Sequence, residues 1–198
     1  QPTSELYRLT VDDQEPYWLY GGQQDNSAVA IPSRAPGGID REDWYTPAGC
    51  ESATVAVDPR DPDVCYVAAL GHLWGPNEQR GVYKTTDGGN NWSAINNGLP
   101  EAQFRGRIGI DIARSNPEVI YAFIDNYEIA APANDARPGA SGRIKGATVY
   151  RSDNRGMSWR QVSGLTPETQ RYMSGHSGTY GWVFGQMRVD PNAENTLY

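Results

Sequence analysis

The feature that most constrains the fold is a hairpin-like stretch that occurs twice in the chain. The first copy runs from Gly81 to Trp92 and reads GVYKTTDGGNNW. The hydroxyl of Thr85 and the carboxylate of Asp87 can accept hydrogen bonds from the free N–H groups of a tight turn. Gly89 can adopt a positive φ at little cost, and Trp92 offers a large apolar face for packing. The stretch therefore predicts two short strands joined by a polar turn.

The second copy aligns with the first without a gap and reads VYRSDNRGMSW from Val149 to Trp159. Its turn has an asparagine where the first copy has an aspartate; this change keeps the hydrogen-bond acceptor and loses the charge. We assign a structural role in turns to eight residues, which are Thr85, Asp87, Gly89 and Trp92 in the first copy and Ser152, Asn154, Gly156 and Trp159 in the second.

A second repeat consists of an alternating strand, a turn that begins with aspartate, and another strand. The turn aspartates are Asp12, Asp58, Asp111 and Asp190. They are spaced about 46, 53 and 79 residues apart, which suits propeller blades of about 40–50 residues with insertions. The repeats start near 7–20, 53–70, 106–124 and 185–198. Frequent glycine (22) and proline (14) between short β-rich runs, with little helical spacing, predict an all-β fold.

The repeats predict the strands of two complete blades. We expect strands over 55–58, 65–70, 81–85 and 92–95, and then over 108–111, 119–124, 148–152 and 159–162. The repeat near residue 9 lacks the hairpin motif, and the repeat near residue 187 has only two strands. The prediction is a β-propeller of four-stranded antiparallel blades, with 1–198 as one propeller-type domain or as part of a larger propeller. The long segment 126–146 between strands is either a binding rim or a surface excursion.

The two hairpins resemble the Asp-box (BNR) turns of sialidase-like and sortilin-like propellers, in which the box is a structural turn on the outside. The chain as a whole resembles the bacterial sortilin-like (VPS10-like) propeller proteins often labelled glycosyl hydrolases. Four segments carry this resemblance: YWLYGGQQDN at 17–26, GCES at 49–52 with VDP at 57–59, VAALGHLWGPN at 67–77, and YRSD at 150–153. In that family the YGGQQDN segment usually follows the GHLW blade, whereas here it precedes it, and family members have more blades.

Composition excludes some classes of function. Acidic residues outnumber basic ones 24 to 17, giving a formal charge of −7, so a nucleic-acid partner is not expected. No apolar run is long enough to span a membrane. Cys50 and Cys65 are either buried thiols or, in an oxidising compartment, a disulfide. The only histidines are His72 and His176, and no Cys/His cluster has metal-ligand spacing, so we predict no metal and no cofactor.

Candidate site residues cluster after glycine-rich bends and in one loop. A glycosidase needs two carboxylates flanking the sugar, and the best candidates are Asp25 and Glu51. Each has a structural alternative, because Asp25 could cap a turn and Glu51 could be a charge at a strand edge. The candidate ligand-binding residues are Gln23, Gln24, Asn26, His72, Trp74, Arg107 and Trp182. Trp74 and Trp182 could equally pack between blades.

Aligning the first strands of the repeats also brings polar residues onto one side. Arg8, Arg107, Gln186 and Arg188 lie two or four residues before a turn aspartate, on the side opposite the apolar positions. They could form an anion or sugar site facing a central channel, or they could hydrogen-bond between blades. Arg107 begins only a weak match to the Arg-Ile-Pro run of sialidases, so sialidase chemistry is not predicted.

These observations support three hypotheses for function. The first is a non-catalytic recognition scaffold that binds protein, peptide or glycan on one propeller face; the resemblance implies a secreted, periplasmic or cell-surface location. The second is a glycoside hydrolase, sialidase-like or xyloglucanase-like, that acts on a polysaccharide. The third is a structural subunit of a larger assembly, in which further blades or subunits are the partners.

Overall fold

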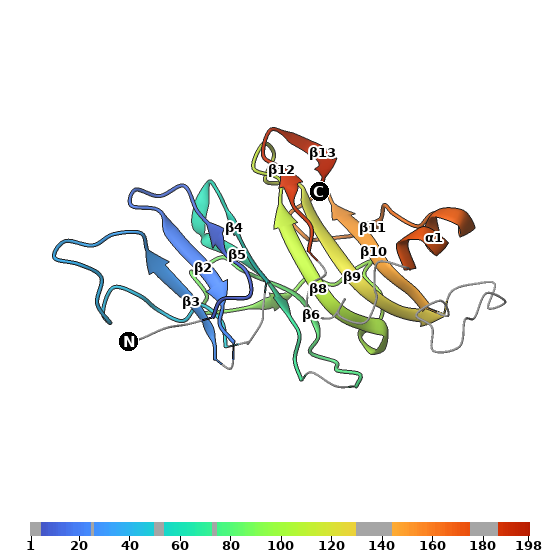
Figure 1. Cartoon of the computed structure of the whole chain (residues 1–198), viewed down its shortest axis with the longest axis horizontal. Helices are drawn as coiled ribbons and strands as arrows, with labels where there is room; N and C mark the ends of the chain where they lie inside the picture. The colour runs from blue at the N-terminus through green and yellow to red at the C-terminus, as the bar shows by residue number, and fades with distance from the viewer. Residues whose placement is uncertain (1–4, 25, 50–53, 73–74, 130–143, 175–185) are drawn as a thin grey trace.

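The structure is a computed structural model of the 198-residue chain. It describes all residues except 1–4, 25, 50–53, 73–74, 130–143 and 175–185. Within the described residues the chain is nearly all β and forms four antiparallel sheets. Each sheet uses consecutive strands in chain order. In Figure 1 the first three sheets follow one another from left to right, and the two C-terminal strands lie at the top. The predicted β class is therefore confirmed, and the sheets do not close into a ring within the described residues.

The first sheet contains β1 (Thr10–Val11), β2 (Trp18–Gly22) and β3 (Ala28–Pro32). Backbone bonds from Ala30 N to Tyr45 O (2.9 Å) and from Tyr45 N to Ala30 O (3.1 Å) attach a further segment to the outer edge of β3. The segment around Tyr45 therefore lies where the other complete sheets have a fourth strand, although the sequence pattern did not indicate a strand there.

The second and third sheets have four strands each. The second consists of β4 (Thr54–Asp58), β5 (Asp61–Ala69), β6 (Gly81–Thr85) and β7 (Ser93–Ala94). The third follows a short 3₁₀ turn, η1 (Ala102–Phe104), and consists of β8 (Arg105–Ile112), β9 (Ile120–Ile129), β10 (Ile144–Ser152) and β11 (Arg160–Gln161). All eight strands occur near their predicted positions. However, β9 and β10 extend into the predicted loop 126–146, and both outer strands begin one residue after their tryptophan.

The C-terminal sheet contains β12 (Val189–Asp190) and β13 (Ala193–Leu197). One helix, α1 (Pro167–Ser174), lies against β10 (Figure 1) and was not predicted. At its start, Thr166 and Thr169 bond reciprocally: Thr169 N donates to Thr166 Oγ1 (3.2 Å), and Thr166 N donates to Thr169 Oγ1 (3.0 Å). This capping pattern and Pro167 at the first helical position are the available sequence signal, because eight residues are too few for an apolar period to stand out.

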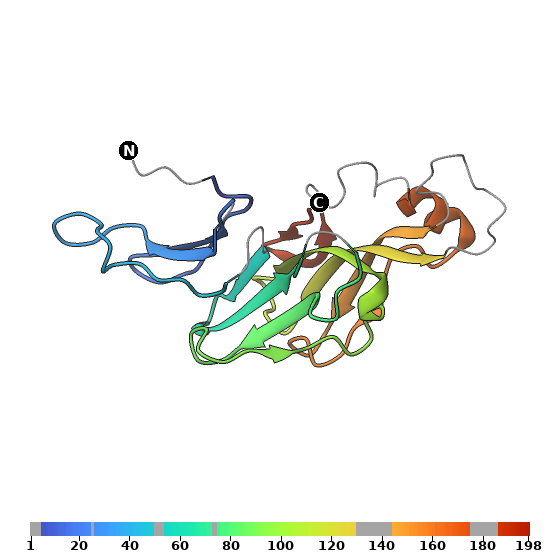
Figure 2. The ribbon, with the colours of Figure 1, turned by 90° about the horizontal axis from the view of Figure 1, so that it is seen from below.

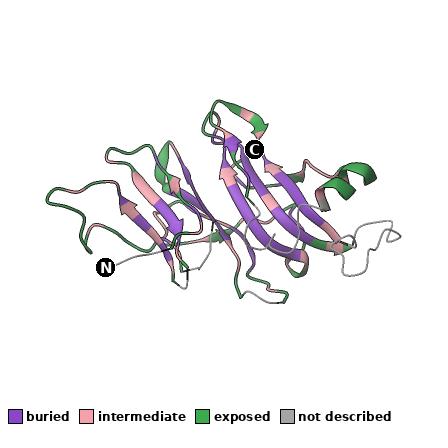
Figure 3. Cartoon of the chain, in the orientation of Figure 1, coloured by how far each residue is buried: buried purple, intermediate pink, exposed green. Residues whose placement is uncertain are grey.

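Within the described residues, three apolar layers join neighbouring sheets. Figure 3 shows that the strands of the central sheets are largely buried. Val55 and Val57 face Tyr20 and the rest of the first sheet, whereas Ala56 belongs to the layer shared with β8 and β9 of the third sheet. A third layer contains Tyr121 of the third sheet together with residues of the C-terminal sheet. Because side chains alternate along a strand, β4 contributes to the layers on both of its sides.

The two hairpin tryptophans occupy equivalent places. Trp92 packs into the layer between the first and second sheets, and Trp159 into the layer between the second and third. The indole N–H of Trp159 donates to the carbonyl of Ile95, on the outer edge of the preceding sheet (2.7 Å). Gly156 has a φ of 85°, which favours glycine at this turn, and a Cβ added there would displace the end of the Ile95 side chain, whose Cδ1 would lie 2.3 Å away.

The first sheet lies at one end of the array, as Figure 2 also shows. Leu9 and Val11 are 43% and 37% exposed, whereas Val55, at the equivalent place in the second sheet, is 2% exposed. Thr10, between them, points the other way and donates to the carbonyl of Val55 (2.7 Å). Leu9 and Val11 are exposed because they face away from the second sheet, and no described layer covers them.

Candidate functional site

The first hairpin turn is held by its own side chains. Thr85 Oγ1 accepts from the N–H groups of Asp87 (3.2 Å) and Gly89 (3.0 Å), and it donates to Asp87 Oδ1 (2.7 Å). Asp87 in turn accepts from the backbone (2.9 Å) and the side chain (2.6 Å) of Asn91. Hydrogen bonds from the Asn91 side chain and backbone, and from Thr85, lower the pKa of Asp87 to about 2. The polar groups of this turn therefore stabilise the turn itself.

The second hairpin repeats the arrangement with a neutral side chain. Ser152 Oγ accepts from the N–H groups of Asn154 (3.3 Å) and Gly156 (2.9 Å) and donates to Asn154 Oδ1 (2.9 Å). Asn154 Oδ1 also accepts from Ser158 N (2.9 Å), as Asp87 does from Asn91. The asparagine therefore supplies the same acceptor that the aspartate supplies in the first copy.

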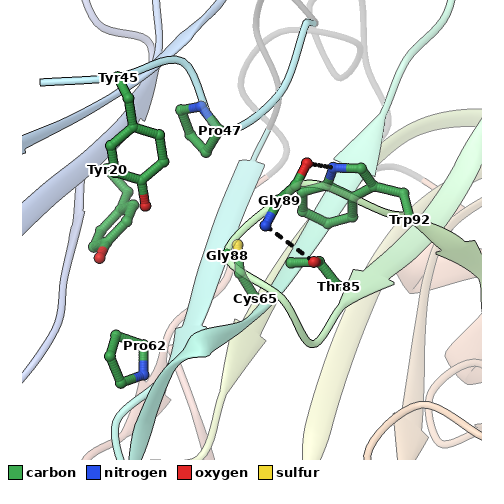
Figure 4. Close-up of a pocket in the computed structure, with 9 residues that line it drawn as sticks. All are labelled: Tyr20, Tyr45, Pro47, Pro62, Cys65, Thr85, Gly88, Gly89 and Trp92. Carbon is green, nitrogen blue, oxygen red and sulfur yellow. Dashed lines mark hydrogen bonds between the residues drawn. The ribbon is translucent and has the colours of Figure 1, made fainter.

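A small cavity lies beside the first hairpin, between the first and second sheets (Figure 4). Tyr20 and Tyr45 line one side, and Cys65, Gly89 and Trp92 line the other. Its volume of about 10 Å³ leaves room for about one water-sized sphere, so it is a gap in the packing and too small for a ligand. Burial raises the pKa of the Cys65 thiol to about 12. Cys65 is free, and Cys50, its predicted alternative partner, lies outside the described residues.

The candidates near the first glycine-rich bend mostly bond locally. Gln23 Nε2 donates to the carbonyl of Ser27 (3.0 Å), and Asn26 Oδ1 accepts from Ser27 N (2.8 Å). Gln24 is exposed, and its backbone N–H bonds the carbonyl of Glu5 (2.8 Å). Four of the predicted site residues lie outside the described residues, namely Asp25, Glu51, Trp74 and Trp182. The predicted carboxylate pair therefore has no described geometry.

The backbone carbonyl of His72 is held by an arginine that the sequence analysis missed. Arg80 donates to the carbonyls of Leu70 (2.8 Å), His72 (2.7 Å) and Arg105 (2.8 Å), and Arg105 Nη1 donates back to the carbonyl of Arg80 (2.9 Å). Both guanidinium groups are buried, and burial lowers the pKa of each. His72 itself is exposed. Arg80 immediately precedes β6 of the second sheet, and Arg105 begins β8 of the third sheet. The two arginines therefore connect these sheets.

The predicted polar set is partly brought together. Arg8 is buried and donates from Nη1 to Thr54 Oγ1 of the second sheet (2.6 Å). Arg107 is also buried, and its Cζ lies 5.9 Å from the ring centroid of Tyr7. Arg188 is exposed, next to β12, and Gln186 is exposed in the segment before it. The contribution of Tyr7 was missed because the alignment covered only the four residues before each turn aspartate, and Tyr7 lies five residues before Asp12.

The charges of three of these arginines act on one another. The pKa of Arg8 is lowered to about 10, first by burial and then by the positive charges of Arg107 and Arg188. The three residues come from the first, third and C-terminal sheets. The charges of three sheets therefore act on one another here. Chemically, such a group of guanidinium donors is suited to binding an oxyanion.

Two other kinds of site are absent from the described residues. No group of three histidine, cysteine, aspartate or glutamate side chains is placed so that it could hold a metal ion. In the described part of the chain, no helix has both the length and the apolar character needed to cross a membrane.

Comparison with known proteins gives a fold relationship only. No family model and no curated protein matches this chain. Among solved structures, the chain is similar to the GH74 xyloglucanase from Xanthomonas campestris, with a TM-score of 0.51 and 16% sequence identity. The match covers 91% of this chain and 24% of that chain, so our chain spans about a quarter of the enzyme's length. At this identity the likeness shows the scaffold, which is that of a β-propeller protein.

Proposed function

We propose that this chain is part of a β-propeller recognition scaffold that binds a protein, a peptide or a glycan on the face where its first strands converge. The observation that carries the proposal is the meeting of Arg8, Thr54 and Arg107, which come from three different sheets. The hairpin side chains, in contrast, bond within their own turns. A face to which several sheets contribute polar side chains is suited to recognition. Substitution of those side chains can change the ligand that is bound, while the sheets that support them stay the same.

We also propose that the two hairpins are Asp boxes and that the chain is related to the bacterial sortilin-like proteins. The matching hydrogen bonds around Thr85 and Ser152 support the first part. The extracytoplasmic location rests on the sequence resemblance alone. Cell fractionation with an antibody against this chain tests the location, and detection only in the cytosol would refute it.

The binding test uses the protein in immobilised form against arrays of peptides and glycans. We expect saturable binding to at least one class of ligand, with weaker binding after the predicted rim residues are changed by His72→Ala, Trp74→Ala or Trp182→Ala. Asn90→Ala is the control, because Asn90 lies on the hairpin turn and bonds the carbonyl of Asp87 there. Rim variants that bind like the wild type would show that the rim has been placed wrongly. The absence of any saturable ligand would refute the scaffold proposal.

A glycoside hydrolase is the second candidate, favoured by the likeness to a solved xyloglucanase. It predicts that the wild-type chain cleaves at least one polysaccharide in a broad panel that includes xyloglucan. It also predicts that Asp25→Asn or Glu51→Gln abolishes cleavage while the unfolding midpoint stays the same. A panel in which nothing is cleaved removes this candidate and leaves the scaffold proposal intact.

A role as a subunit of a larger assembly is the third candidate. It is favoured by the exposed face at Leu9 and Val11 and by the C-terminal sheet, in which two strands are described. Open sheet edges and exposed apolar positions favour association. The mass of the protein in solution, measured by light scattering, tests this role. A strictly monomeric mass over a wide concentration range, with no added partner bound, would contradict it.

A further inference from the structure

The described layers between neighbouring sheets are all built from two unlike sides. The first strand of the later sheet contributes aliphatic residues, as Val55 and Val57 of β4 do between the first and second sheets. The second strand of the earlier sheet contributes one tyrosine to each layer, and these are Tyr20, Tyr66 and Tyr121. We call the side of a sheet that packs on the preceding sheet its leading face, and the side that packs on the following sheet its trailing face. In each described layer, a leading face therefore packs on a trailing face.

No described layer covers the leading face of the first sheet. Its aliphatic residues, on the side away from Tyr20, are Leu9, Val11, Leu19, Val29 and Ile31. Leu9 and Val11 are exposed and the other three are half-buried, whereas Val55 and Val57 of the second sheet are buried beneath the first sheet. The end sheet of a repeat array normally has a polar outer face, so an apolar one indicates a surface that a partner covers.

The C-terminal sheet leaves the opposite kind of face uncovered. Leu197 packs in the layer with the third sheet, so the next residue, Tyr198, points away from that layer. Tyr198 follows the turn residue Asp190 by eight positions, as Tyr20 follows Asp12, and each hydroxyl donates to Oδ2 of its aspartate (3.2 and 2.9 Å). Tyr20 is 3% exposed beneath the second sheet, whereas Tyr198 is 77% exposed. Tyr198 therefore marks a trailing face that no described layer covers.

We propose that a second copy of this chain covers the leading face of the first sheet with the trailing face of its own C-terminal sheet. The proposal rests on the proposed role as a subunit of a larger assembly and names the partner. It continues the contact by which the sheets already pack, in which aliphatic residues of one sheet meet a tyrosine-bearing face of another. Because one chain carries both kinds of uncovered face, a second copy supplies the matching surface. Such a head-to-tail interface produces a closed ring or a longer array of copies.

The test measures the mass of the full chain against concentration by analytical ultracentrifugation. We expect the mass of the wild type to rise with concentration. Val11→Asp puts a charge on the leading face and Tyr198→Asp puts one on the trailing face, and each should raise the dissociation constant at least tenfold. Met157→Asp is the matched control and should associate like the wild type, because Met157 is also an exposed apolar residue but lies on the second hairpin turn. The unfolding midpoint of each variant is measured, and Leu9→Asp replaces Val11→Asp if that variant is unfolded.

Mixing the two variants separates a head-to-tail interface from a symmetric one. Val11→Asp keeps its trailing face and Tyr198→Asp keeps its leading face, so an equimolar mixture should form a dimer although neither variant associates alone. A symmetric pairing of two leading faces would be lost in Val11→Asp, kept in Tyr198→Asp and not restored by mixing. That pattern would overturn the head-to-tail proposal.

The remaining outcomes separate this partner from the proposed functions. A wild-type chain that stays monomeric at every concentration, or that associates equally well in both variants, would overturn the second copy as the partner. A different protein whose binding is lost in Val11→Asp would also overturn it and would leave the role as a subunit standing. The recognition scaffold is decided separately, by the peptide and glycan arrays.

Discussion

The buried carboxylate of Asp58 joins the second and third sheets, and its removal has a calculable cost. Asp58 is 1% exposed. Its Oδ1 accepts from Arg60 N (3.0 Å) and Nε (3.1 Å), and its Oδ2 accepts from Arg60 Nη2 (3.0 Å) and from Arg155 Nη2 of the second hairpin (2.8 Å). Arg60 Nη2 also reaches Glu118 of the third sheet (3.0 Å). One acid therefore shapes its own turn and holds the neighbouring sheet.

We expect Asp58→Ala to lower the free energy of unfolding by about 3 kcal/mol. Breaking a buried ion pair costs about 3–5 kcal/mol when the remaining charge stays buried. The lower end applies here because the side chains of Arg60 and Arg155 are 50% and 33% exposed and can regain water. For a chain of this size, about 3 kcal/mol corresponds to a fall of about 6–12 °C in the unfolding midpoint. Asp58→Asn keeps the bond to Arg60 N and should cost about half as much.

The assay measures unfolding by urea and by heat at several pH values, with circular dichroism as the signal. Burial alone would raise the pKa of Asp58, but hydrogen bonds and charge from Arg60, and then the charge of Arg155, outweigh it and leave the pKa below its usual value. A lowered folded-state pKa means that the contribution is present above the unfolded pKa of about 3.9 and is lost as the pH falls through the folded value. The wild type and Asp58→Asn should therefore converge in stability below about pH 4.

Asp61→Asn is the matched control, because Asp61 is exposed and accepts one backbone bond, from Asp63 N (3.1 Å). Its unfolding free energy should stay within about 0.5 kcal/mol of the wild type. A loss of unfolding free energy in Asp58→Ala as small as that in Asp61→Asn would refute the proposed role of Asp58. That role is also refuted if the difference between the wild type and Asp58→Asn is the same at pH 3 as at pH 7.

Four further predictions follow from single contacts. Arg80→Ala should lower the unfolding free energy by about 2–4 kcal/mol in urea, because it leaves three carbonyls without their donor; unchanged stability would contradict this. Gly98→Ala should cost about 1–3 kcal/mol in the same assay, because φ is 92° and the new Cβ would lie 2.1 Å from the carbonyl oxygen of Trp159; a neutral result would show that the turn can rearrange. Cys65, with its raised pKa, should react with iodoacetamide at pH 8 only after unfolding, and fast labelling of the native chain would count against its burial. Asp87 should titrate near pH 2 in a carboxyl-carbon NMR titration, and a value near 4 would mean that its turn bonds are absent in solution.

Much of the sheet arrangement was predictable because the chain repeats itself. The alternation around Val55 and Val57 indicated both the strand and its apolar side, and the turn aspartates indicated where strands end. The segment around Tyr45 was missed because it pairs with β3 through an isolated bridge and needs no strand-like run of its own. The helix at 167–174 was missed because its start depends on two threonines that bond each other.

The candidate site was less predictable, for a reason that Arg80 and Arg105 illustrate. Each donates to backbone carbonyls, and every residue type supplies a backbone carbonyl, so no partner motif marks these contacts in the sequence. The cluster of Arg8 and Arg107 could be predicted because both lie at repeat positions whose counterparts in other sheets are polar. Its neighbour Tyr7 lies at a position with no such pattern and could be found only from the structure.

The turn aspartates show how far a repeat determines chemistry. Asp58 and Asp111 hold the same position in successive repeats, yet the pKa of Asp58 is lowered and that of Asp111 is raised. Burial opposes ionisation at both sites, and the charges of two arginines favour it at both. At Asp58 the two arginines also hydrogen-bond the carboxylate. At Asp111 the arginines act through their charge, and the carboxylate accepts a hydrogen bond from the backbone N–H of Val189 (2.8 Å). The repeat therefore specifies where a carboxylate lies, and the groups around it, in its own turn and in the neighbouring sheet, specify how it ionises. The arginine cluster follows the same rule. Equivalent positions in the repeats bring its side chains together, but the residue type at those positions, and therefore the charge, differs from one repeat to the next.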